Sequence, residues 1–87
     1  MSVEAVLKHW LLSRIQRGEL YVKSSDIETS LVHYGKEYWD VLHTPSTYSR
    51  AWRLFRSDQA YKDIDISKIL EHPTKSRQMT WRIETGT

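Results

Sequence analysis

TPSTYSRAWRLFR, residues 44–56, is the stretch from which the fold can be inferred. Thr44 can cap a helix, and Pro45 suits the first helical position, because the N–H that proline lacks would be unpaired there anyway. The sequence therefore predicts a helix over residues 45–57. Its apolar residues recur at the spacing of one helix face. They are Tyr48, Ala51, Trp52 and Phe55.

The other face of this predicted helix is polar and basic. Its members are Ser46, Ser49, Arg50, Arg53 and Arg56. A solvated surface is the commoner reason for several arginines on one helix face, but an ordinary exposed helix interleaves Glu with Arg at i, i+4. Residues 43–57 contain no Asp or Glu. The pattern therefore favours a face that meets an anionic partner.

Two further helices and a short strand are predicted before residue 44. Residues 2–17 have helical spacing, with Ser2 as N-cap and Gly18 as the left-handed residue after the end. Residues 20–22 are typical of a short strand.

A capping box, Ser25-Asp26-Ile27-Glu28, predicts a second helix that starts near Asp26 and stops at Gly35. Residues 36–43 are left unassigned between a helical turn and a packed connection.

The C-terminal part changes to a period of two. Ile64 and Ile66, and then Met79, Trp81 and Ile83, alternate with polar residues, which predicts two strands. The polar segment between them contains Pro73 and would form the tip of a hairpin.

Composition limits the chain to one domain over residues 1–87, with 13 basic and 11 acidic residues. Eight of the basic and five of the acidic residues fall in 45–87, so the second half is the basic half. Zero cysteines exclude disulfides and thiolate metal sites. No apolar run approaches the roughly 20 residues of a membrane span, and no secretory signal is present, so we expect an intracellular, cytoplasmic protein without membrane contact.

An enzyme is not expected. The four histidines are scattered without metal-ligand spacing, and the three glycines form no phosphate-binding loop. We therefore predict no catalytic residues, no metal, no cofactor and no small-molecule substrate. Trp10, Trp52 and Trp81 are in register with apolar neighbours and are predicted to be core residues, whereas Trp39 is a candidate exposed contact.

The order of helix, strand, two helices and hairpin resembles a winged helix-turn-helix domain. The resemblance rests on residues 25–28, on residues 44–53 and on the segment from Pro73 to Ile83. TPSTYSRAWRLFR is similar to the recognition helix of many small prokaryotic and phage regulators. The fold class implied is α+β, with three helices and a small antiparallel β-hairpin wing.

The resemblance implies a double-stranded DNA-binding protein, a small regulator of transcription or replication. The third helix (45–57) would read the major groove and the wing (72–78) would contact the backbone. Arg50 and Arg53 suit bidentate pairing with guanine. The DNA-contacting residues implied are Ser46, Thr47, Ser49, Arg50, Arg53, Arg56, Lys75, Ser76 and Arg77. A homodimer or a protein partner would add specificity, and in a bacterium or phage the protein would associate with the nucleoid.

A winged helix that binds protein is the alternative function, for example as an inhibitor or adaptor of host machinery, because a fold alone does not determine function. The binding surface would then be Tyr38 and Trp39, or the acidic stretch from Asp58 to Asp65.

Overall fold

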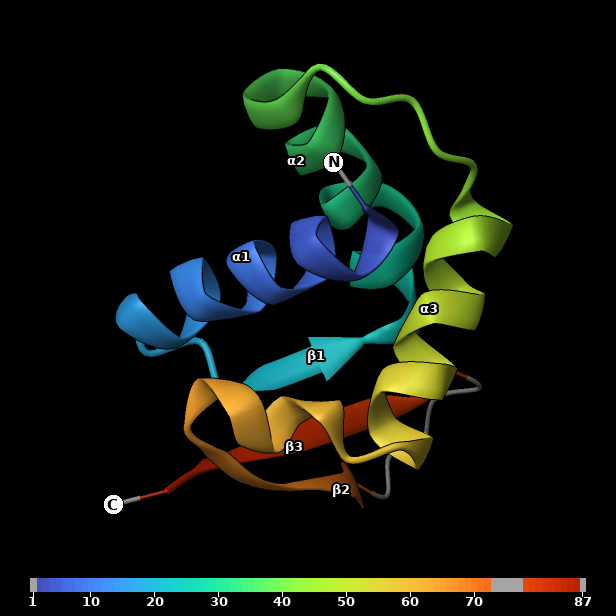
Figure 1. Cartoon of the computed structure of the whole chain (residues 1–87). Coiled ribbons are helices and arrows are strands. Elements are labelled where there is room, and N and C mark those ends of the chain that lie inside the picture. Colours follow the sequence, from blue (N-terminus) through green and yellow to red (C-terminus); the bar gives the residue numbers. More distant parts are fainter. Residues whose placement is uncertain (1, 73–77, 87) are drawn as a thin grey trace.

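The computed structural model describes residues 2–72 and 78–86 and has an α+β architecture, with three α-helices and a three-stranded antiparallel sheet in that part of the chain (Figure 1). The elements are α1 (Val3–Gln16), β1 (Tyr21–Lys23), the π-helical η1 (Asp26–Ser30), α2 (Leu31–Trp39), α3 (Pro45–Ser57), the 3-10 helix η2 (Ala60–Ile64), β2 (Ile66–His72) and β3 (Thr80–Thr85).

The sheet has the order β1-β3-β2, so the last strand of the chain is the central one. Val22 lies opposite Trp81 on one side of β3, and Leu70 lies opposite Arg82 on the other. The register of β2 shifts between Ile66 and Lys68, where the strand has a bulge. In Figure 1, α1 and α2 lie above the sheet, and α3 descends beside one end of it.

The core fills the space between the helices and the sheet. The predicted inner face of α3 is confirmed, because Tyr48, Trp52 and Phe55 are buried. Trp10, Trp52 and Trp81 are core residues, as predicted. The other fully buried apolar residues are Val6, Leu7, Leu11, Val22, Ile27, Leu31, Ile66 and Ile83.

The predicted ends of two helices are confirmed in atomic detail. The Oγ of Ser2 accepts a hydrogen bond from the backbone N–H of Ala5 at 3.2 Å. Gly18, just past α1, has φ +77°, a conformation that glycine adopts without steric cost. The Oγ1 of Thr44 accepts from the N–H of Thr47 at 3.3 Å, which starts α3 at Pro45.

The predicted capping box at Ser25 is wrong. Helical structure already begins at Ser24, and Ser25 has helical angles and makes no capping bond. Instead, the carboxylate of Asp26 accepts from the backbone N–H of Lys23 at 3.0 Å. Asp26, the third residue of the helical segment, therefore accepts the hydrogen bond of Lys23, the residue before that segment. The acidic residue of a capping box has the same role, but here it lies two residues earlier than the predicted Glu28.

The predicted stop at Gly35 is also wrong. The helix continues to Trp39 and ends at Asp40, which has a left-handed φ of 50°. Gly35 is buried, and a Cβ at this position would run into the hydroxyl oxygen of Tyr48 and lie 3.3 Å from a methyl of Val41. The glycine therefore allows α2 and α3 to approach closely.

Two strand boundaries differ from the prediction. Ile64 ends the 3-10 helix and is not in a strand, because Asp65 has a left-handed φ of 63° and β2 begins only at Ile66. Met79 precedes β3, which begins at Thr80. Residues 73–77 of the predicted wing lie outside the described residues.

We expect Gly35→Ala to destabilise the fold by about 1–3 kcal/mol, because the added methyl has no room beside Tyr48. Tyr48→Phe removes the hydroxyl, whose pKa burial raises and which has no hydrogen-bond partner in the described chain. Urea unfolding of both single variants and the double variant tests the contact. Tyr48→Phe is expected to be nearly neutral and to recover most of the loss; additive effects would contradict the close approach.

Candidate nucleic-acid interface

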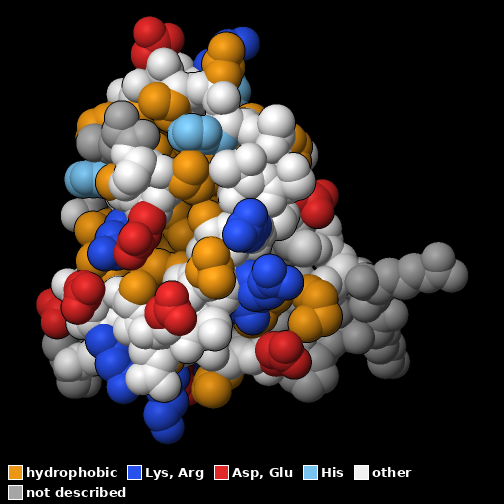
Figure 2. Space-filling view, turned by 45° about the vertical axis from the view of Figure 1, so that its right-hand side comes forward, with side chains coloured by type: hydrophobic (Ala, Val, Ile, Leu, Met, Phe, Trp, Pro, Cys, Tyr) orange, Lys and Arg blue, Asp and Glu red, His pale blue; other side chains and the backbone are white. Residues whose placement is uncertain are grey.

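The outward face of α3 presents two exposed arginines, Arg50 and Arg53. Within residues 2–72 and 78–86, neither lies within 4.0 Å of a carboxylate oxygen, whereas Arg14 and Arg17 pair with Asp26 and Glu19. Figure 2 shows Lys and Arg side chains gathered beside hydrophobic ones on the side of the molecule that is turned forward there. Two of the cations predicted from the sequence are therefore free to meet an external anion.

Arg56 lies differently, although it belongs to the same predicted face. It is half-buried, and its guanidinium carbon lies 4.6 Å from the ring centre of Trp81 and 5.5 Å from that of Trp52. Burial lowers the pKa of Arg56, Glu71 raises it, and Arg53 lowers it. Arg56 is thus packed on two core indoles, where cation–π attraction and contact with its aliphatic stem hold it.

The predicted hydroxyl contacts divide into two groups. Ser46 and Thr47 lie at the start of α3, where the oxygen of Thr44 is 3.1 Å from the Ser46 hydroxyl and 2.8 Å from the Thr47 hydroxyl. These hydroxyls already serve the helix cap. Ser49 lies two residues further along α3 and is half-buried. Lys75, Ser76 and Arg77 lie outside the described residues.

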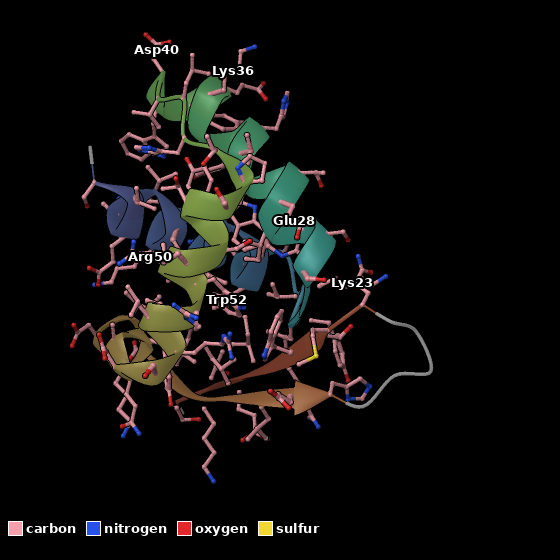
Figure 3. The ribbon with its side chains drawn as sticks, turned by 90° about the vertical axis from the view of Figure 1, so that its right-hand side faces the viewer. Lys23, Glu28, Lys36, Asp40, Arg50 and Trp52 are labelled. Atoms are coloured by element: carbon pink, nitrogen blue, oxygen red, sulfur yellow. The ribbon has the colours of Figure 1, made fainter. Side chains whose placement is uncertain are left out.

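A groove of about 410 Å³ runs beside α3, between this helix, the start of the second helical segment and β3. We call it the basic groove. It is lined by Ser24, Ile27, Ser49, Arg50, Trp52, Arg53, Arg56 and Trp81. Figure 3 looks onto this side of the molecule, with Arg50 and Trp52 on α3 and Lys23 and Glu28 on the segment across from it.

The floor of the basic groove is aromatic. The rings of Trp52 and Trp81 meet edge to face, with their centres 5.5 Å apart and their planes at 78°. Sequence reasoning assigned both tryptophans to the core and missed that they also line a groove. Ser24 and Ile27 were also not predicted as groove residues, because no local pattern shows that the start of the second helix lines the same groove as Arg53.

Of the two surfaces suggested for protein binding, the acidic stretch has Asp58, Asp63 and Asp65 exposed, whereas the pair Tyr38 and Trp39 is only partly exposed. Leu42 is an exposed neighbour of that pair that the sequence did not single out. Tyr38 is 66% exposed, and Leu42, in the connection after α2, is 80% exposed. Trp39 is half-buried, with its ring centre 4.8 Å from that of His9, so its predicted exposure is wrong in part.

Searches for other kinds of site and for relatives give no match. Across the described residues, no three His, Asp or Glu side chains are grouped to hold a metal ion, and no helix is long and apolar enough to cross a membrane. The chain matches no protein-family model, no curated protein and no solved structure.

We expect Arg56→Ala to cost about 1–2 kcal/mol of unfolding free energy, because it removes the guanidinium and its stem from Trp52 and Trp81. Arg50→Ala is the matched control, and its effect should stay within about 0.5 kcal/mol because Arg50 is exposed. Urea unfolding followed by tryptophan fluorescence measures both. Equal effects of the two substitutions would show that Arg56 is not a packed residue.

Proposed function

We propose that this chain is a winged-helix protein that binds double-stranded DNA through α3. The observation that carries the proposal is the pair Arg50 and Arg53, exposed and without a carboxylate partner in the described chain. They project from a helix whose opposite side is buried in the core. The element order and the sheet order β1-β3-β2 are compatible with a winged helix.

The dimensions of α3 suit a DNA groove. Its 13 residues give a length of about 20 Å at 1.5 Å per residue. The major groove, about 12 Å wide, admits one helix. Arg50 and Arg53 are three residues apart and therefore project from the same side of the helix. Each guanidinium fork can pair with the O6 and N7 of guanine or with phosphate oxygens.

The β2–β3 hairpin supplies the second element of the proposed interface. The sequence between β2 and β3 contains Lys75, Ser76 and Arg77, which lie outside the described residues and which we propose contact the DNA backbone, where each phosphate neutralised strengthens the salt dependence of binding. A single domain of this size covers only about 600–1,000 Å² of protein surface on DNA. We therefore propose a small regulator of transcription or replication that gains specificity as a homodimer or with a partner.

Fluorescence anisotropy with a labelled random-sequence duplex over a salt series tests this proposal. The Arg50→Ala, Arg53→Ala double variant is expected to weaken binding at least about tenfold and, if both contact phosphate, to flatten the salt slope by about two units. The control is Arg17→Ala, Lys36→Ala, which removes the same charge from exposed sites outside α3. The control should bind as the parent does.

Two results would contradict the proposal. One is DNA binding that is equally strong in the parent and the arginine double variant, which would show that α3 does not contact the DNA. The other is the absence of any binding at low salt by a folded protein, since electrostatic attraction is then at its strongest.

Protein binding is the second candidate function, and the exposure of Tyr38 and Leu42 favours it. Exposed aromatic and aliphatic side chains are typical anchors of protein interfaces. If this candidate is right, Tyr38→Ala and Leu42→Ser will abolish partner binding, and the arginine double variant will retain it. If DNA binding is right, the same two substitutions will leave the anisotropy curves unchanged.

A further inference from the structure

The basic groove has the size and lining of a small-molecule site. Its volume of about 410 Å³ is in the range of roughly 300–1,000 Å³ that such sites occupy. Ile27, Trp52 and Trp81 give it an apolar floor, and Arg50 and Arg53 contribute the charge. We propose that this groove binds a small planar aromatic anion.

The charge of the proposed ligand follows from the arginines. Arg56 has already lost part of its hydration by burial, and no carboxylate oxygen of the described chain lies within 4.0 Å of it. A partly buried cation gains more from an anion than a fully hydrated one does, because the intervening medium screens less. Glu71 attracts Arg56 electrostatically, although its carboxylate lies beyond 4.0 Å, and Arg53 repels Arg56. An anion in the groove would relieve that repulsion.

The aromatic character of the ligand follows from the floor. Trp52 is 2% exposed and Trp81 is 6% exposed, and the indole N–H of neither has an acceptor in the described chain. An oxygen or nitrogen of a ligand would supply one. The guanidinium of Arg56 already lies over both indoles, so a flat ring in the groove would stack on this planar guanidinium and meet only the small exposed parts of the two indoles.

The proposed occupant is small and distinct from the DNA duplex. Duplex phosphates can meet exposed Arg50 and Arg53, but duplex bases are stacked on one another and are not available to a narrow apolar floor. Because the ligand and the proposed DNA surface share these two arginines, we expect the ligand to compete with DNA. This competition rests on the proposed function, whereas ligand binding itself does not.

The test follows the four tryptophan indole N–H signals of the full chain by NMR, without DNA. The probes are 2-naphthoate, an aromatic carboxylate, and adenosine monophosphate, an aromatic phosphate. Their uncharged controls are 2-naphthalenemethanol and adenosine. Signals are assigned with single Trp→Phe variants.

We expect at least one anion to shift the Trp52 and Trp81 signals saturably, with Kd below about 1 mM, and its uncharged control to bind at least about tenfold more weakly. The Trp10 and Trp39 signals should stay in place, because neither residue lines the groove and the Trp10 N–H donates to Ser30 Oγ at 3.4 Å. The ratio of the Kd of each anion to that of its own uncharged control measures what the carboxylate or the phosphate contributes, and the larger contribution identifies the preferred anionic group.

Substitutions connect the signal shifts to the groove. Arg53→Gln should weaken anion binding about tenfold without changing stability, since Arg53 is exposed. Arg17→Gln, which removes an equal charge at the far end of α1, should leave binding unchanged. The proposal would be overturned if neither anion shifts the two signals, if all four signals shift together, or if Arg53→Gln binds as the parent does.

Failure of this proposal can be distinguished from failure of the proposed function. Ligand binding in the groove is measured by NMR in the absence of DNA, and DNA binding is measured by anisotropy in the absence of the ligand. If the protein binds DNA through α3 but binds neither anion, only the proposal of a ligand in the groove is overturned. A protein that binds an anion in the groove but no DNA would overturn only the DNA proposal.

Discussion

The edge-to-face contact between Trp52 and Trp81 determines which side of α3 faces outward. Trp81 belongs to β3, the strand that pairs with both β1 and β2, so the contact fixes α3 relative to the whole sheet. Side chains on a helix recur about every 3.6 residues. With Trp52 held inward, Arg50 and Arg53 must point away from the core, as their exposure shows. The polar surface is therefore a consequence of core packing.

The same contact gives the arginines of α3 two different roles. Arg56 is one turn beyond Trp52, and its guanidinium lies over both indoles. Cation–π attraction of this kind contributes about 0.5–1 kcal/mol at exposed sites and more where water is excluded, against the cost of partial burial that lowers the pKa of Arg56. The three arginines that the sequence assigns to one helix face therefore differ in burial: Arg56 is half-buried, and Arg50 and Arg53 are exposed.

Local signals were sufficient to predict α1 and α3, whereas contacts with residues distant in the sequence explain the error at Gly35 and the different role of Arg56. Ser2 and Thr44 cap their helices through partners three residues away, a relation visible in sequence. The role of Gly35 depends on Tyr48 in another helix, and close packing there outweighs the general tendency of glycine to end a helix. The packing of Arg56 depends on Trp81, 25 residues later. The basic groove could not be predicted, because three separate segments form it.

Net charge is a poor guide to the partner of this chain, because the ion pairs are unevenly distributed. The described pairs of Lys or Arg with a carboxylate use Lys8 and Arg14 on α1 and Arg17 just after it. A net charge of +2 therefore conceals the difference between the paired cations around α1 and the exposed Arg50 and Arg53 on α3, which have no carboxylate partner in the described chain. Salt screens exposed charges over about 8–10 Å, so an approaching molecule responds to the local cations and not to the total. In the proposals made above, the exposed arginines attract an anion, and the depth and aromatic floor of the groove would then select among anions by shape.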